Sequence, residues 1–296
     1  MFQKHVFSHK TVVVVAGPTA SGKSAFALKE ASQNSGIIIN GDSQQLFQGL
    51  PVLTAQPSQE DLLQLPHHLY EVYPYNHQGH SVITWTEHAH TLIKEAHRKK
   101  MIPWIVGGTG FYLETFMKGM SPLPAFPPED QESFRCTLKD VSTPLLYENL
   151  QKKDPVFSAK ISFNDRQRIL RGLFIFHATG RALSSFYAHA HDVPPYDFYR
   201  IYLAPSREQL LKSITRRWSQ MKERGVLEEV QNFSARPSYH TSPLCKAIGF
   251  QEILLYIQGH ISEETLQTLY FQKTCQYAKR QRCWFSHRFF PHCTIS

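Results

Sequence analysis

The sequence predicts an α/β fold with a parallel sheet at its core and a mostly helical insertion. Three apolar runs, "TVVVVAG", "GIIIN" and "IPWIVGG", are each typical of a strand that is buried on both faces of a parallel sheet. Helical spacing follows the first run in "KSAFALKEAS" and precedes the third in "TEHAHTLIKEAHRKK". This alternation of strands and helices predicts a doubly wound core.

A proline-rich stretch marks the point where the chain leaves this core. The segment "SPLPAFPPED" begins at Ser121 and holds four prolines within eight residues, a pattern typical of a rigid turn or linker. The chain then has helical character until Pro194 and Pro195, after which "YDFYRIYLAP" has the pattern of a strand that returns to the sheet. We therefore expect a core of residues 1–120 and 196–296, a helical insertion of residues 121–195, and amphipathic helices over 208–233, 247–258 and 263–285.

Composition indicates a globular protein without a membrane span. The 296 residues, 42% of them hydrophobic, suffice for one large domain or for a domain with an insertion. The N-terminus has neither a long apolar run nor the layout of a signal peptide, so we expect a cytoplasmic protein. Five scattered cysteines without a C-x-x-C pair favour a reducing compartment. Cys283, His287, His292 and Cys293 crowd the C-terminus, but their spacing fits no zinc motif, which favours ordinary tail residues.

Basic residues are concentrated in two places. The formal net charge is +8, and residues 211–296 contain 12 Lys and Arg against 6 Asp and Glu. A second cluster, Arg166, Arg168 and Arg171, lies in "NDRQRILRG". Charge alone favours solvated helix faces, yet two separate clusters also make a polyanionic partner plausible.

The segment "GPTASGKS" matches the phosphate-binding Walker A pattern in full and lies between a predicted strand and a predicted helix. It predicts a P-loop NTPase-like core. The backbone N–H groups and the helix N-terminus favour phosphate oxygens, Lys23 adds positive charge, and the Ser24 hydroxyl can bind Mg²⁺. A purely structural glycine turn is the alternative. The predicted diphosphate-binding residues are Gly17, Pro18, Thr19, Ala20, Ser21, Gly22, Lys23 and Ser24.

Two further polar residues follow neighbouring strands. The run "WIVGGTG" ends without the aspartate that commonly holds the metal of a nucleoside triphosphatase, whereas Asp42 follows the second strand in "INGDSQQ". A carboxylate there can take a proton from a nucleophile; a turn role, or helix capping through Ser43, is the alternative. Gly108 and its neighbour Gly107 allow close approach of the backbone, and Thr109 can bond a ligand or cap a helix.

Together these segments resemble the tRNA dimethylallyltransferases, which prenylate the adenosine next to the anticodon. The resemblance covers most of the chain through "GPTASGKS", "GDSQQLF", "TAQP", "PHHL", "PWIVGGTGFY", "SPLP", "NDRQR", "AIGF" and "YAKRQRCWF". It implies that the phosphates leave as pyrophosphate from dimethylallyl diphosphate, without ATP, and that the chain is an enzyme of the bacterial type without a zinc-finger extension. Nothing in the sequence demands more than a monomer.

The resemblance also implies roles for individual residues. Lys23 and Ser24 would serve the diphosphate and its Mg²⁺, Arg217 would add a second clamp, and Asp42 would deprotonate the adenine amine with Thr109 close by. The segments that would bind tRNA are Asp42, Ser43, Gln44 and Gln45; Gln167, Arg168, Ile169, Leu170 and Arg171; and Lys246 to Gln251 with Gly249 and Phe250. The two basic clusters fall at or near the last two segments, which favours RNA binding.

Several positions depart from the family's usual residues, and other functions stay open. Phe47 and Phe250 replace tyrosine, Gln56 in "LTAQP" replaces lysine, Phe174 replaces glutamate, and Cys275 and Cys283 replace arginine and threonine. These changes bear on tRNA choice, affinity and the shape of the prenyl-donor pocket. The alternatives are a P-loop kinase of a nucleotide or small metabolite, a prenyltransferase that uses free AMP, ADP or ATP, and a non-catalytic RNA-binding module.

Overall fold

The computed structural model describes residues 8–119, 123–124, 126–187 and 193–296. The chain divides into two compact units, one of Met1–Met117 with Pro195–Ser296 and one of Lys118–Pro194. The expected junction at residues 120 and 121 lies outside the described residues. We refer to these as the sheet unit and the helical unit and describe each by itself.

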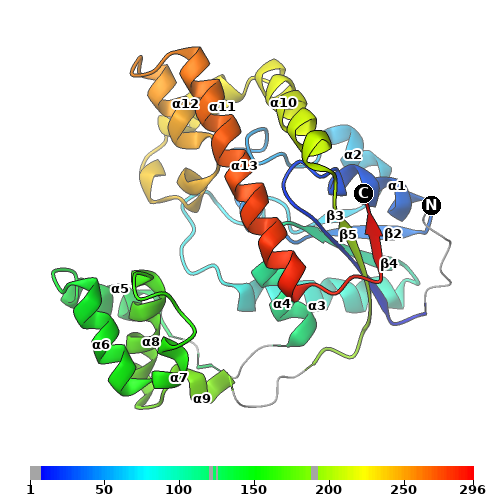
Figure 1. Cartoon of the computed structure of the whole chain (residues 1–296). Coiled ribbons are helices and arrows are strands. Elements are labelled where there is room, and N and C mark those ends of the chain that lie inside the picture. Colours follow the sequence, from blue (N-terminus) through cyan, green and yellow to red (C-terminus); the bar gives the residue numbers. More distant parts are fainter. Residues whose placement is uncertain (1–7, 120–122, 125, 188–192) are drawn as a thin grey trace. The chain divides into compact units, whose positions relative to one another are not determined.

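The sheet unit is built on a six-stranded sheet with the order β3-β2-β4-β1-β5-β6, in which every neighbouring pair is parallel (Figure 1). This confirms the predicted α/β fold class. The three apolar runs form β1, β2 and β4, and the strand expected after Pro195 forms β5. The strands span Thr11–Ala16 (β1), Gly36–Asn40 (β2), His67–His68 (β3), Ile102–Gly107 (β4), Asp197–Leu203 (β5) and Cys293–Ile295 (β6).

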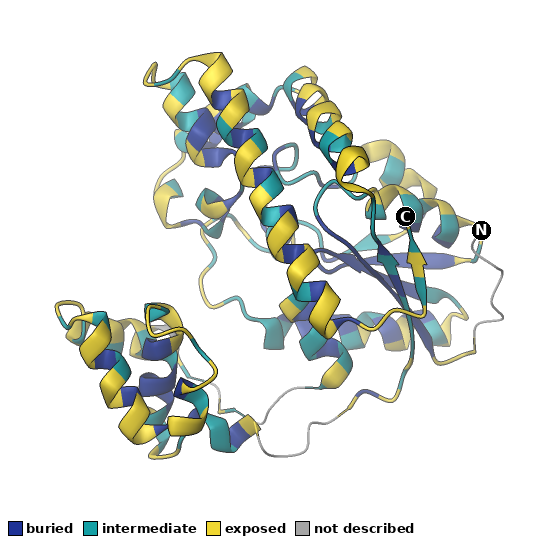
Figure 2. Ribbon diagram, viewed as in Figure 1, coloured by how far each residue is buried: buried dark blue, intermediate teal, exposed yellow. Residues whose placement is uncertain are grey.

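Alternate residues of the central strands supply two separate cores. Val12 and Val14 join one apolar cluster, whereas Val13 and Val15 join the other, because successive side chains of a strand point to opposite faces. Figure 2 shows β1 and β2 buried throughout and β4 buried after its first residue. Helix α1 packs on the second cluster, and the other long helices pack on the first. The helices are α1 Lys23–Ser32, α2 Gln59–Gln64, α3 Val82–Arg98, α4 Gly110–Lys118, α10 Arg207–Glu223, α11 Val226–Ser234, α12 Phe250–Ile257 and α13 Glu263–Arg288.

Two of the expected C-terminal helices differ from the prediction. The helix expected over 208–233 is divided into α10 and α11 at Gly225, whose φ of 79° is left-handed and interrupts the helical hydrogen bonding. The helix expected from residue 247 begins at Phe250, because Gly249 has a φ of 97° and a short 3₁₀ turn, Pro243–Lys246, precedes it. The third helix extends to Arg288.

The helical unit has its own apolar core, and none of its described residues lies in a strand. Leu146, Leu150, Ile169 and Leu173 pack together, and Phe174 and Phe186 belong to an adjoining cluster. The helices of this unit are α5 Pro128–Thr137, α6 Thr143–Lys153, α7 Pro155–Ser158, α8 Arg166–Thr179 and α9 Leu183–Tyr187. In neither unit do the described residues form a helix with both the length and the apolar character that a bilayer crossing requires.

Candidate active site

The candidate site lies at the carboxyl edge of three adjacent strands. Strand β1 leads into the phosphate loop, β2 leads to Asp42, and β4 leads to Thr109. In the phosphate loop, Ala20 and Gly22 adopt left-handed backbone angles, with φ of 60° and 83°, before α1 begins at Lys23. The Lys23 Nζ donates to the carbonyl oxygen of Pro18 at 3.1 Å, which folds this side chain back over the loop.

Three charged side chains act on one another across the phosphate loop. Burial lowers the pKa of Lys23 to about 8; the Asp42 carboxylate opposes this shift and the Arg217 guanidinium adds to it. Arg217, on α10, donates from Nη1 to the Thr19 hydroxyl at 3.1 Å. The charges of Asp42 and Arg217 therefore both act on Lys23, and Arg217 is bonded to the phosphate loop that Lys23 follows.

Buried polar atoms at this point lack partners. Among the described residues, the Ser21 Oγ, the Arg217 Nε and the Gln44 Oε1 are buried without a hydrogen bond. Buried polar groups in folded proteins are nearly always hydrogen-bonded, so unpaired atoms of this kind need an explanation. An anionic ligand held beside Lys23 and Arg217 provides one for the two donors, the Ser21 hydroxyl and the Arg217 Nε.

Asp42 is held by the end of β2. Asn40 is fully buried; its Oδ1 accepts from the Asp42 N at 2.8 Å, and its Nδ2 donates to the Asp42 and Leu69 carbonyl oxygens, each at 2.9 Å. The Asp42 Oδ1 accepts from the Gln44 N at 3.0 Å, so the turn role that the sequence left open is present and fixes the carboxylate. No helix begins at Ser43, which removes the capping alternative.

Thr109 links β4 to the Asp42 loop. Its Oγ1 accepts from the Ser43 N at 3.1 Å, so the hydroxyl bonds the neighbouring loop. The two glycines before it allow this approach: a Cβ on Gly107 would stand 2.1 Å from the Gly41 carbonyl oxygen, and a Cβ on Gly108 would stand 2.4 Å from the Gln281 Nε2. Close packing therefore explains why glycine occupies both positions, against the Gly41 backbone at Gly107 and against the Gln281 side chain at Gly108.

Gln281 of α13 is a site residue to which sequence reasoning gave no role. Its side chain is buried; Oε1 accepts from the Thr19 N at 2.7 Å and Nε2 donates to the Gly108 carbonyl oxygen at 2.9 Å. One side chain thus ties the phosphate loop to the loop after β4. The segment "YAKRQRCWF", which carried part of the resemblance, was the available signal.

Aromatic groups complete the surroundings of Asp42. Burial raises the pKa of both Tyr112 and Tyr277, and in each case the Asp42 carboxylate adds to the rise, which places both phenols near its charge. Tyr112 is hydrogen-bonded to the Nε2 of His80. Burial, with smaller contributions from His77 and His88, lowers the pKa of His80 to about 4, so this imidazole is neutral at physiological pH.

The segments predicted to bind tRNA lie in both units. In the helical unit, Gln167 and Arg168 are exposed, and Arg171 donates from Nη1 to the Gln131 Oε1 at 3.2 Å. In the sheet unit, Lys246 and Gln251 are exposed. The side chains of Ile169, Leu170 and Phe250 face apolar cores, and RNA contact at these three positions stays a prediction.

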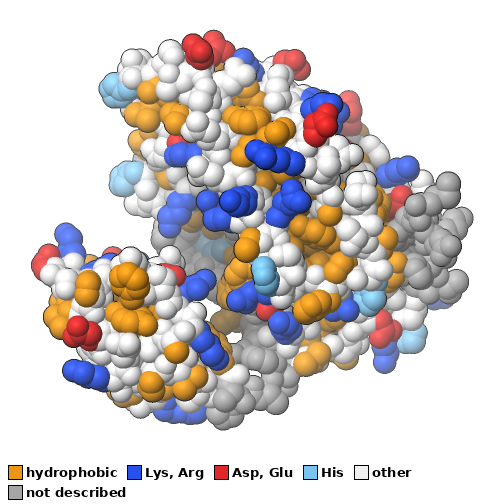
Figure 3. Space-filling model, in the orientation of Figure 1, with side chains coloured by type: hydrophobic (Ala, Val, Ile, Leu, Met, Phe, Trp, Pro, Cys, Tyr) orange, Lys and Arg blue, Asp and Glu red, His pale blue; other side chains and the backbone are white. Residues whose placement is uncertain are grey.

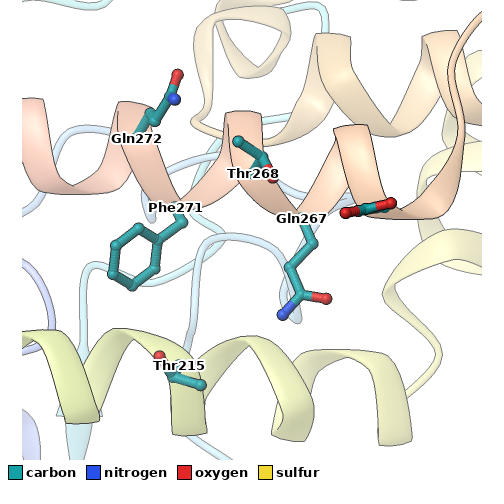
Figure 4. Close-up of a pocket in the computed structure, with 6 residues that line it drawn as sticks. Thr215, Gln267, Thr268, Phe271 and Gln272 are labelled. Atoms are coloured by element: carbon teal, nitrogen blue, oxygen red, sulfur yellow. The ribbon is translucent and has the colours of Figure 1, made fainter.

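Exposed basic residues that were not singled out lie on α13. Lys279, Arg280 and Arg282 are exposed, and Figure 3 shows Lys and Arg side chains gathered where this helix forms the surface. A groove of about 490 Å³ runs between α10 and α13, where Phe271 and Gln267 point toward Thr215 (Figure 4). A second groove of about 980 Å³ shares Phe271 and Gln272 with it; no residue of the phosphate loop lines either groove.

The departures from the family pattern are accommodated by packing. Phe47 is buried, and its ring meets that of His80 edge to face at 5.6 Å. Gln56 is buried and donates to the Phe47 carbonyl oxygen at 3.3 Å. Phe174 packs edge to face on Phe126 and Phe134 in the helical unit. The two phenylalanines therefore lie in apolar cores, and Gln56 is buried beside one of them.

A full phosphate loop after β1 and a fixed carboxylate after β2, both at the carboxyl edge of one parallel sheet, define a P-loop α/β protein with a site for a phosphorylated ligand. Residues 45–288 match the family model of the IPP transferases, and the chain belongs to this family. The resemblance identified from the sequence is thereby confirmed.

Individual relatives agree with this assignment. The chain is 36% identical over 278 residues to a tRNA dimethylallyltransferase of Rhodopseudomonas palustris (strain BisB18), covering 93% of this chain and 88% of the relative. A relative of the same name from Bradyrhizobium sp. (strain ORS 278) is 36% identical over 292 residues, covering 96% of this chain and 92% of the relative. The solved tRNA isopentenylpyrophosphate transferase of Bacillus halodurans matches with a TM-score of 0.67 and 28% identity over 97% of this chain and 89% of that one. A solved eukaryotic dimethylallyltransferase acting on tRNA matches with a TM-score of 0.79 and 26% identity, and the match covers 93% of this chain and 70% of that one.

Proposed function

We propose that this chain transfers the dimethylallyl group of dimethylallyl diphosphate to the exocyclic amine of the adenosine on the 3′ side of the tRNA anticodon, with release of pyrophosphate. The observation that carries the proposal is the convergence of Lys23, Arg217 and Asp42 on the phosphate loop. Two cations suit a departing diphosphate, and one carboxylate suits an amine that must lose a proton. The names of the relatives supply the identity of both substrates.

The phosphate loop, Lys23 and Arg217 would hold the diphosphate. The unpaired Ser21 Oγ and Arg217 Nε fit such a ligand, because both are donors that it would satisfy. Mg²⁺ would be held by the Ser24 hydroxyl, which is exposed in the first turn of α1, together with diphosphate oxygens and water. Bound there, the ion would neutralise negative charge on the diphosphate.

Asp42 would act as the general base. The Gln44 N occupies its Oδ1, and among the described residues no hydrogen bond occupies its Oδ2, which is therefore the oxygen to receive a proton. As the amine nitrogen bonds to the allylic carbon, the carbon–oxygen bond to the diphosphate breaks. The electron pair of that bond leaves with pyrophosphate, and the amine proton passes to Asp42.

The acceptor is proposed to be tRNA rather than a free nucleotide. The adenosine must leave the stack of the anticodon loop to reach Asp42, as in other enzymes that act on a nucleobase. The predicted helical insertion, residues 121–195, would contact the anticodon stem-loop through Gln167, Arg168 and Arg171, and the sheet unit through Asp42 to Gln45, Thr109 and Lys246 to Gln251. The same proposal takes the chain to act as a cytoplasmic monomer.

The test measures label transfer without ATP. Purified protein and Mg²⁺ are incubated with radiolabelled dimethylallyl diphosphate and either unmodified tRNA carrying adenosines after its anticodon or AMP. Label in tRNA alone supports the proposal. Label in AMP alone would move the acceptor to free nucleotides, and ATP turnover without any prenyl transfer would indicate a kinase.

Asp42→Asn tests the base assignment. The amide keeps the size of the side chain and its bond from the Gln44 N but cannot accept the amine proton, so kcat should fall about 10²- to 10⁴-fold. The Kd for tRNA should stay within about threefold of wild type. Asp140→Asn, at an exposed carboxylate of the helical unit, is the control. A near-normal kcat for Asp42→Asn would refute the general-base role.

A further inference from the structure

Tyr187 is an exposed aromatic residue on a firmly anchored short helix. It is the last residue of α9 in the helical unit, and 48% of it is exposed. Its ring lies 6.3 Å from that of Phe157, and α9 packs against α7 and α8. About half of Tyr187 therefore stays exposed, although its ring lies against Phe157.

A buried carboxylate fixes the helix that carries Tyr187. Asp154 is 1% exposed; its Oδ1 accepts from the Phe157 N at 2.9 Å and from the Ser184 Oγ at 2.6 Å, and its Oδ2 accepts from the Ser184 N at 2.8 Å. Phe186, next to Tyr187, is buried in the core of the helical unit. The ring of Tyr187 is thus presented from a rigid turn.

Arg168 and Arg171 belong to α8, which packs against α9, the short helix that carries the exposed ring. Burial raises the pKa of Tyr187, Arg171 and Arg168 oppose this rise, and Asp154 adds to it, so all three charges act on the phenol. Arg181 lies over the Phe186 ring at 4.6 Å. Asp154 is occupied by its three hydrogen bonds. A second carboxylate, Asp165, pairs with the Arg168 Nε at 3.3 Å.

We propose that Tyr187, flanked by Arg168 and Arg171, is a stacking site for one unpaired base of the RNA that this chain binds. Single-stranded nucleic acids are held by aromatic rings that stack on bases and by cations that contact the adjoining phosphates, and these residues supply both. Stacking tolerates any base, so the site contributes affinity for an open loop rather than a choice of sequence. The inference rests on the proposed function for the identity of the partner as RNA.

The first test compares the affinity of full-length variants for unmodified tRNA. Tyr187→Leu should weaken binding about 5- to 150-fold, the range expected when one base no longer stacks. Tyr187→Phe keeps the ring and should bind within about twofold of wild type. Phe290→Leu, at an exposed phenylalanine of the sheet unit, is the matched control and should have no effect. Wild-type affinity of Tyr187→Leu, or an equally weakened Tyr187→Phe, would overturn the proposal.

Salt dependence separates stacking from charge. The slope of log K against log salt should be unchanged in Tyr187→Leu, whereas Arg168→Gln or Arg171→Gln should reduce its magnitude by about 0.7 for each phosphate that the arginine neutralises. A reduced slope in Tyr187→Leu would mean that the residue acts by positioning the arginines, which would overturn the stacking role.

A fluorescent base locates the contact. Anticodon stem-loops that carry 2-aminopurine at one loop position at a time should show quenching on binding at one position, and Tyr187→Leu should abolish it. Persistence of that quenching would contradict the inference. Label transfer to tRNA by the wild-type enzyme is measured in parallel, so failure of the stacking site is distinguished from failure of the proposed function.

Discussion

Replacement of Gln281 by alanine should loosen the phosphate loop from α13. The change removes the bond from the Thr19 N at 2.7 Å and the bond to the Gly108 carbonyl oxygen at 2.9 Å, and it leaves one half-buried and one buried backbone group unpaired. Each unpaired buried group costs about 1–3 kcal/mol, although water that enters the space left by the side chain recovers part of this cost. We therefore expect the free energy of unfolding of the sheet unit to fall by about 2–4 kcal/mol.

The assay combines urea unfolding with steady-state kinetics. Because Thr19 belongs to the phosphate loop, Gln281→Ala should also raise the KM for dimethylallyl diphosphate. Gln276→Ala, at an exposed glutamine on the same helix, is the matched control and should change the free energy of unfolding by no more than about 0.5 kcal/mol. If Gln281→Ala and Gln276→Ala were equally stable and equally active, the bridging role of Gln281 would be refuted.

Two further predictions test the glycines and the lysine of the site. Gly107→Ala should lower the free energy of unfolding by about 3 kcal/mol or more, because the new Cβ meets the Gly41 backbone. Gly41→Ala should cost less, because the nearest atom there is the flexible Leu113 Cδ2 at 3.0 Å. Equal losses of stability for the two variants in denaturant unfolding would contradict this prediction. The kcat/KM for dimethylallyl diphosphate should fall as pH rises through about 8, because the free enzyme's Lys23 then loses the charge that attracts the diphosphate. Lys23→Met should flatten that limb of the pH profile, and a wild-type profile without a decline up to pH ~9.5 would contradict the prediction.

Local pattern predicted the central strands but not the edges of the sheet. Strands β1, β2 and β4 are continuous apolar runs, which is the pattern that burial on both faces demands. The edge strands β3 and β6 are short; their existence depends on pairing of His67 with Ile38 and of Cys293 with Ile201, which no local pattern encodes. Gly225 was a visible signal for the break between α10 and α11, but helical periodicity continues on both sides of it.

The same distinction applies to the site. The phosphate loop was predicted because its function depends on local backbone geometry, which a short motif specifies. Gln281 was assigned to a helix and nothing more, because its role arises from contacts with Thr19, 262 positions earlier, and with Gly108, 173 positions earlier. The role of Arg217 was predicted from the family resemblance alone, since nothing around it in the sequence distinguishes it from other helical arginines.

The two hydrogen bonds of Thr19 indicate how the phosphate loop would assist the reaction. Its N–H is committed to Gln281, and its hydroxyl accepts from Arg217, so the loop is held by α10 and α13 before any phosphate arrives. A loop fixed in this way spends no free energy on reorganisation when charge develops on the departing diphosphate. Its donors and the neighbouring Lys23 therefore stabilise the transition state more than the intact substrate, which is the condition for raising kcat. If this is the role of the α13 contact, Gln281→Ala will lower kcat as well as raise KM, whereas a loop that merely binds substrate would change KM alone.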